Sequence, residues 1–248
     1  MGTELFAGWE ETIIWSCLQG IMGQVRMNDA RDAAMARLGD FAFFAGVSDE
    51  ELLKSLSDNQ GQDFLIVVPQ NDEWAQLIEK CYGEKAGKVT RYAMKKEKDI
   101  FEVSRLEQAA TQLAEGYELR MIEECEYDLC KQSDWAKDLV SQFKDYDAYK
   151  NLGLGVVALK DGNLAAGASS YSRYAEGIEI EVDTKQEHRR KGLAYACSAK
   201  LILECLRRGL YPSWDAQNLH SVALAEKLGY HFSHEYTAYE VTGLSYSK

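Results

Sequence analysis

Three consecutive basic residues precede a glycine at the start of a long apolar helix pattern. Arg189, Arg190 and Lys191 supply positive charge, and Gly192 lets the backbone approach a ligand closely. A helix N-terminus offers unpaired N–H groups and about half a positive charge, so it binds anions without a particular side chain. We interpret this loop as a phosphate cradle. The alternative interpretation is an ordinary solvated turn.

The elements on either side must hold this loop in place. Before it, residues 178–184 alternate apolar and acidic side chains, which predicts a strand. After it, apolar residues recur at helical spacing over 193–208, and Gly209 ends the helix. Ala194 keeps the first helical turn narrow. A short strand at 211–214 is predicted to follow.

Two motifs in this region resemble those of the GNAT acetyltransferase superfamily. Arg189-x-x-Gly192-x-Ala194 is similar to the Q/R-x-x-G-x-G/A signature with which that superfamily holds the pyrophosphate of acetyl-CoA. The segment 218–230 (NLHSVALAEKLGY) resembles the helix that follows the fifth GNAT strand. Because both occur in the family's order and spacing, the chain is identified by resemblance as a GNAT protein.

Further segments resemble the two-part bacterial GNAT family that includes the zwittermicin A resistance acetyltransferase. They are 9–23 (WEETIIWSCLQGIMG), 39–46 (GDFAFFAG), 90–93 (TRYA) and 211–215 (YPSWD). The likeness covers nearly the whole chain. It implies a primary amine of a small molecule, including an amino-containing antibiotic, as the acetyl acceptor.

The pattern of elements predicts an α/β (α+β) protein in two parts. Residues 1–115 are interpreted as a smaller α/β domain and residues 116–248 as the acetyltransferase domain. The resemblance implies the acyl-CoA N-acyltransferase fold for the second domain, with a mixed central sheet splayed between strands 4 and 5. Those strands correspond to 178–184 and 211–214.

Helix boundaries are also predicted from local signals. Ser48-x-x-Glu51 and Ser104-x-x-Glu107 have the spacing of capping boxes, in which the serine starts a helix. Residues 135–149 are predicted to form one helix, and two short strands are predicted near the C-terminal end of the chain.

In the family, the pantetheine arm of acetyl-CoA enters the splay as though it were a further strand. The resemblance assigns this contact to backbone groups of Val182 and Thr184, and it assigns a hydrogen bond from the far side to Asn218. The alternative role of Asn218 is an N-cap. The complete set predicted to bind acetyl-CoA is Val182, Thr184, Arg189, Arg190, Lys191, Gly192, Leu193, Ala194, Asn218 and Ser221.

Attack of a neutral amine on a thioester requires a base. Alternation on the predicted strand 178–184 places Glu179, Glu181 and Asp183 on one face. Glu181 and Glu179 are candidates for the base or for binding the substrate ammonium, and Asp215 is a third candidate. The alternatives are that this face meets solvent and that Asp215 is a turn residue.

One residue departs from the family pattern. Many GNAT enzymes carry a tyrosine four residues before the glycine that ends the helix after the fifth strand, where its hydroxyl can protonate the departing thiolate. In this chain that glycine is Gly229, and Ala225 occupies the position of the tyrosine. Either Tyr171, Tyr230 or Tyr236 serves instead, or the thiolate leaves without assistance, or catalysis has been lost.

Composition limits the partners. A formal net charge of −12 argues against a nucleic-acid partner, while one basic loop in an acidic protein suits an anionic cofactor and a cationic amine substrate. Neither a C-x-x-C pair nor histidines at zinc spacing occur, so no metal site is predicted. The chain has no apolar run of roughly 18 residues and no basic signal start, so no membrane association and a cytoplasmic location are expected. A homodimer is left open.

Two functions of different classes fit these features. The first is an acetyl-CoA-dependent N-acetyltransferase, and the second is a non-catalytic acetyl-CoA-binding sensor or regulatory module. A nucleotide-binding protein is disfavoured because neither G-x-x-x-x-G-K-S/T nor G-x-G-x-x-G occurs.

Overall fold

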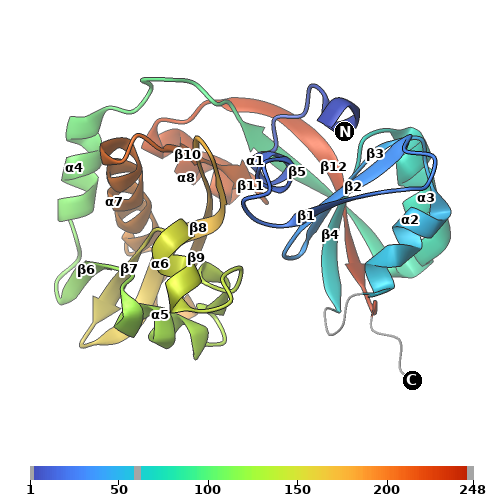
Figure 1. The fold of residues 1–248 in the computed structure, drawn as a ribbon. Coiled ribbons are helices and arrows are strands. Elements are labelled where there is room, and N and C mark those ends of the chain that lie inside the picture. Colours follow the sequence, from blue (N-terminus) through green and yellow to red (C-terminus); the bar gives the residue numbers. More distant parts are fainter. Residues whose placement is uncertain (1–2, 59–62, 245–248) are drawn as a thin grey trace. The chain divides into compact units, whose positions relative to one another are not determined.

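Two sets of strands organise the protein, whose computed structural model describes residues 3–58 and 63–244 (Figure 1). One unit comprises Met1–Tyr92 and Glu235–Lys248, and the other Ala93–His234. The chain leaves the first unit within strand β5 (Ala86–Met94) and returns to it within β12 (Phe232–Thr242). The predicted domain boundary between residues 115 and 116 stays a prediction, which limited proteolysis would test.

The first unit is built on strands in the order β1-β2-β3-β4-β12-β5. The pairs β1–β2, β2–β3 and β4–β12 are antiparallel, and β3–β4 is parallel. Its elements other than β5 and β12 are η1 (Thr3–Phe6), α1 (Thr12–Leu18), β1 (Gln24–Met27), β2 (Ala33–Leu38), β3 (Phe41–Gly46), α2 (Glu50–Lys54), η2 (Ser55–Asp58), β4 (Phe64–Pro69), α3 (Asp72–Tyr82) and η3 (Gly83–Lys85).

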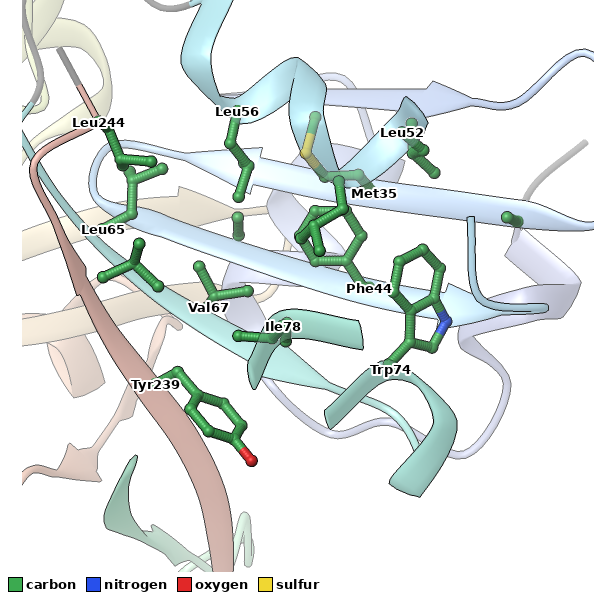
Figure 2. Packing of buried hydrophobic residues seen from close by; sticks show 14 residues of the cluster. Met35, Phe44, Leu52, Leu56, Leu65, Val67, Trp74, Ile78, Tyr239 and Leu244 are labelled. Carbon is green, nitrogen blue, oxygen red and sulfur yellow. The ribbon is translucent and has the colours of Figure 1, made fainter. Parts of the chain in front are cut away.

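Aromatic and aliphatic side chains from the strands and from α2 and α3 fill the core of this unit (Figure 2). Asn71 caps α3 by accepting the Trp74 backbone N–H at 3.0 Å, which fixes the first turn of the helix. The fully buried Trp74 ring lies 4.8 Å from that of Phe44, and its indole N–H donates to the Gly46 carbonyl at 2.9 Å. The tryptophan therefore fills apolar volume without losing a hydrogen bond.

Both predicted capping boxes are wrong in their starting residue. Helix α2 is capped by Asp49, whose carboxylate accepts the Leu52 N–H at 2.8 Å, rather than by Ser48. Helix α4 (Val103–Thr111) begins after Glu102, without a side-chain cap, and not after Ser104. Several neighbouring residues can start a helix, and tertiary packing selects among them.

The second unit has a five-stranded sheet in the order β10-β9-β8-β7-β6. Only β9–β10 is parallel. Besides α4, its elements are β6 (Tyr117–Met121), α5 (Glu124–Lys131), η4 (Lys137–Leu139), α6 (Tyr146–Leu152), β7 (Gly155–Lys160), β8 (Asn163–Tyr174), β9 (Gly177–Thr184), η5 (Gln186–His188), α7 (Leu193–Arg207), β10 (Tyr211–Ser213), β11 (Asp215–Ala216) and α8 (Leu219–Leu228).

The helix predicted at 135–149 is replaced by the short turn η4 and by α6. The carboxylate of Asp145 accepts the Ala148 N–H at 2.9 Å and starts α6 there. Similarly, the two strands predicted near the C-terminal end are one continuous strand, β12.

Helices cover both faces of the second sheet. On one face, Leu139 of η4 lies against Gly167, and the Tyr149 hydroxyl of α6 lies 2.8 Å from Ser169 Oγ. On the other, α7 packs along β7, β8, β9 and β10, with α4 at its side (Figure 1). Strand β8 is consequently buried continuously from Leu164 to Ser172.

The pairing of β9 with β10 stops partway along β9. Its register runs from Gly177 opposite Tyr211 to Glu179 opposite Ser213, whereas β9 continues to Thr184. The predicted mixed sheet, splayed between its fourth and fifth strands, is confirmed. No helix in the described part of the chain is both long and apolar enough to cross a membrane.

Gly177 permits the close approach at the start of this pairing. A Cβ there would overlap the Tyr211 carbonyl and the Tyr174 hydroxyl, whereas a Cβ at Gly87 would lie 3.7 Å from the Glu240 carbonyl, an ordinary contact. We expect Gly177→Ala to lower the free energy of unfolding by about 1–3 kcal/mol. Gly87→Ala should change it by less than about 1 kcal/mol. Equal urea midpoints for the two variants would contradict this prediction.

Candidate functional site

The outer half of β9 presents backbone groups on the side where β10 is absent. Lys185 donates its N–H to the Ala165 carbonyl of β8 at 3.0 Å. Because N–H groups alternate along a strand, those of Thr184 and Val182 are turned to the opposite edge. These are the two residues predicted to contact pantetheine, and that role stays a prediction.

The edge groups of Thr184 have partners within the loop region. The Thr184 N–H donates to Asp183 Oδ1 at 2.7 Å, and the Thr184 carbonyl accepts from Arg189 Nε at 3.3 Å. Burial raises the pKa of Asp183 above its usual value, and the Thr184 N–H and the charge of Arg189 partly oppose that rise. Arg189 thus connects the basic loop to the end of β9.

The loop between β9 and α7 contains two left-handed backbone conformations. Arg190 has φ of 62° and Gly192 has φ of 78°. Gly192 is the N-cap of α7, and its carbonyl accepts the first helical hydrogen bond from Ala196 at 3.0 Å. The N–H groups of Leu193 and Ala194 precede that bond and have no acceptor within the helix. A Cβ on Gly192 would meet open space.

The structure therefore brings the predicted cradle residues together at one helix N-terminus. Arg189, Arg190, Lys191 and Gly192 are exposed, while Leu193 is buried and anchors the first turn of α7. An exposed concentration of N–H groups and cationic side chains can bind a diphosphate.

A second contact of the loop was not predicted from the sequence. Tyr117 of β6 lies with its hydroxyl 2.7 Å from His188 Nδ1 and accepts from Lys191 Nζ at 3.0 Å. Burial, and secondarily the charge of Lys191, lower the pKa of His188. The neutral ring can therefore accept a hydrogen bond from the Tyr117 hydroxyl. Lys160 Nζ lies 5.3 Å from the Tyr117 ring centroid. Because Tyr117 is more than 70 positions from His188 and Lys191 in the sequence, no local pattern predicts these two contacts.

The acidic face of β9 is the face covered by η4 and α6. Glu181 is opposite Ser169, which contacts Tyr149 of α6. Glu179 is only 6% exposed, whereas Glu181 is half-buried. Both side chains are enclosed by protein to different degrees, so the alternative of a simple solvent-facing surface is wrong for Glu179. Their catalytic roles stay predictions.

The segment after β10 no longer pairs with β9. Trp214 donates its indole N–H to Ser221 Oγ at 3.1 Å, and half-buried Asp215 begins the two-residue strand β11. Asn218 caps α8 by accepting the Ser221 N–H at 3.0 Å. The alternative role considered for Asn218, the N-cap, is therefore present. Binding of the cofactor by Asn218 and Ser221, and catalysis by Asp215, stay predictions.

The tyrosines considered as proton donors differ in their surroundings. Tyr230 is buried and donates to the Pro212 carbonyl at 2.6 Å, and burial raises its pKa well above the usual value. Tyr236 belongs to the first unit, where its hydroxyl accepts from Arg91 Nε at 3.2 Å. Tyr171 is 7% exposed in β8. Ala225 itself is fully buried in α8.

Sequence comparison places these features in one family. Residues 3–239 match the model of the GNAT acetyltransferase family. The chain is similar to YdfB of Bacillus subtilis (strain 168), described as an uncharacterized N-acetyltransferase. The two are 25% identical over 203 residues, which cover 79% of this chain and 71% of that protein.

Solved structures agree with this match. A GCN5-related N-acetyltransferase-like protein from Streptococcus suis 89/1591 is 45% identical, with a TM-score of 0.91 and coverage of 96% of each chain. A putative GNAT acetyltransferase from Novosphingobium aromaticivorans DSM 12444, 18% identical with a TM-score of 0.57, covers 93% of this chain and 96% of that chain and shares the fold. With the splayed sheet and the loop at the N-terminus of α7, these matches show that the chain belongs to the GNAT acetyltransferase family and is an N-acetyltransferase.

Proposed function

We propose that the protein transfers the acetyl group of acetyl-CoA to a primary amine of a small molecule. The observation that carries this proposal is the end of the β9–β10 pairing at Glu179, followed by the cradle at the N-terminus of α7. One continuous segment thus offers a strand edge for an amide-bearing arm and a cationic helix end for a diphosphate. Acetyl-CoA, the donor that GNAT enzymes generally use, contains both groups.

The donor would lie along residues of two neighbouring segments. Val182 and Thr184 would form hydrogen bonds with the pantetheine amides. Binding at Thr184 would displace the Asp183 carboxylate, which now accepts a hydrogen bond from the Thr184 N–H. The loop from Arg189 to Ala194 would hold the pyrophosphate, and Asn218 and Ser221 would border the arm. Open space beside Gly192 is compatible with an anion at that position.

The acceptor amine would approach the acidic face of β9. Its nitrogen lone pair attacks the thioester carbonyl carbon, the C–S bond breaks, and the CoA thiolate leaves. The proton lost by the amine passes to a carboxylate, for which we favour Glu179 because it is buried where the strand pairing ends. Glu181 would bind the substrate ammonium before deprotonation, and Asp215 is the remaining candidate.

An amino-containing antibiotic is one class of acceptor that fits this site. Its cationic amines suit a protein with a formal net charge of −12 and a carboxylate-bearing strand. The resemblance to the family of the zwittermicin A resistance protein supports the same class. A cytoplasmic location, where acetyl-CoA is made, would be consistent with this function.

A non-catalytic acetyl-CoA sensor is the second candidate, favoured specifically by Ala225. This residue occupies the position of the tyrosine found in many GNAT enzymes and is fully buried. Release of CoA thiol from acetyl-CoA should be measured with aminoglycosides, polyamines, amino acids and short peptides. We expect turnover with at least one small amine. Tight acetyl-CoA binding without turnover on any of them would support the sensor.

The cradle assignment predicts the effect of a charge at Gly192. Gly192→Asp places a carboxylate beside the pyrophosphate, and we expect acetyl-CoA affinity to fall at least about 100-fold in calorimetry. Gly162→Asp is a matched control because Gly162 has φ of 76° and also faces open space, so both substitutions impose similar backbone strain. Unchanged affinity in folded Gly192→Asp would show that the cradle is elsewhere.

The base assignment predicts a loss of turnover with Glu179→Gln. We expect kcat to fall about 100-fold or more and the acid limb of the pH–rate profile to disappear, with little change in acetyl-CoA affinity. Glu181→Gln should chiefly raise KM for the amine. Glu84→Gln, an exposed position in the first unit, removes the same charge as a control. If Glu179→Gln retained the wild-type profile, another group would be the base.

A further inference from the structure

Three buried polar residues lie in register across three strands of the second sheet. Ser172 of β8 is the cross-strand partner of Glu179 in β9, and Ser213 of β10 is its partner on the other side. Both serines are 0% exposed and Glu179 is 6% exposed. Residues opposite one another share a face, with Cβ atoms about 5 Å apart. We call these three residues the Ser–Glu–Ser row.

A β-bulge creates one half of this row. Pairing passes from Ser170 opposite Ile180 directly to Ser172 opposite Glu179, which leaves Tyr171 as the extra residue. Without the bulge, Tyr171 would face Glu179 and Ser172 would point to the other side of the sheet. The bulge therefore turns a hydroxyl toward the carboxylate.

A tyrosine supports the other half of the row. Tyr174 lies with its hydroxyl 2.9 Å from Ser213 Oγ. Burial, and secondarily the charge of Glu179, raise the pKa of Tyr174, so its hydroxyl stays protonated at neutral pH. When Tyr174 donates to Ser213, the Ser213 hydroxyl retains its own proton to donate to Glu179.

The hydroxyl of Ser172 supplies an independent observation. Within the described residues, its buried oxygen has no hydrogen-bond partner. A buried hydroxyl is destabilising unless it bonds, and the polar side chain directly opposite is that of Glu179.

We propose that Ser172 and Ser213, with Tyr174 behind Ser213, are positioning residues that donate to the Glu179 carboxylate and keep it ionised to accept the amine proton. This inference rests on the proposed function, in which Glu179 is the base. Removal from water favours a neutral carboxylic acid, and hydrogen bonds to the charged form oppose that effect. The row thus allows a carboxylate to be both buried and ionised.

Titratable groups face this region from each neighbouring element. The charge of Glu179 contributes to the raised pKa values of Tyr174, Tyr211 and Tyr230, for which burial is the main cause. Further titratable groups on or over this face, within the described part of the chain, include Glu181 and Asp183 of β9, Asp138 of η4 and Tyr149 of α6. The charge of Glu176 also contributes to the raised pKa of Tyr174.

The test is the pH dependence of kcat/KM for Ser172→Ala and Ser213→Ala with an amine accepted by the wild type. We expect the acid limb to move to higher pH by about one unit in each, since an ionised base loses a hydrogen bond. Tyr174→Phe should shift it less. Ser198→Ala is the matched control, because Ser198 in α7 is equally buried and likewise has no partner among the described residues.

A titration without turnover keeps the test independent of activity. The side-chain carboxyl carbon of Glu179 can be labelled with ¹³C, and its NMR signal is assigned by its absence in Glu179→Gln. We expect the chemical shift of this signal to titrate at higher pH in both serine variants. Midpoints equal to those of Ser198→Ala would overturn the positioning role. Loss of the acid limb in Glu179→Gln with unshifted serine variants would leave the proposed function intact, whereas a wild-type profile in Glu179→Gln would reject Glu179 as the base.

Discussion

The candidate site depends on the point at which β9 and β10 separate. Beyond Ser213 the chain follows other contacts, because Trp214 bonds Ser221 and the next two residues form β11. The last five residues of β9 therefore lack β10 as a neighbour, and their backbone groups form an edge inside a folded sheet. An edge of this kind must be occupied by a side chain, water or a ligand. Asp183 already occupies part of it by binding the Thr184 N–H.

Local sequence patterns predicted the elements that carry strong periodicity. The alternation over 178–184 became β9, and the apolar spacing after Gly192 became α7, which ends at Arg207. Patterns decided by a single residue were less informative. Asp49 caps α2 although Ser48 has the expected spacing, and Asp145 starts a helix inside a stretch predicted to be helical throughout. In both cases the residue that caps the helix depends on how its backbone enters the turn, which a one-dimensional pattern does not contain.

The basic loop at the N-terminus of α7 was predictable because its residues are contiguous, whereas its supports are distant in the sequence. Tyr117 reaches His188 and Lys191 from the edge strand β6, and Ser172 lies opposite Glu179 only because of a bulge. Both arrangements depend on strand order and register, which arise from the whole sheet. Ionisable residues of a candidate site can thus be found from their types, but the neutral hydroxyls that lie beside them in the fold require the three-dimensional structure.

The bulge at Tyr171 also restricts how the length of β8 can vary during evolution. Deletion of Ser172 would restore regular pairing with Tyr171 opposite Glu179, and the hydroxyl now opposite the carboxylate would be absent. A deletion in the neighbouring turn around Gly162 would leave the bulge and this pairing unchanged. Among homologues, we therefore expect length changes to accumulate in the hairpin turn and to be rare within the second half of β8.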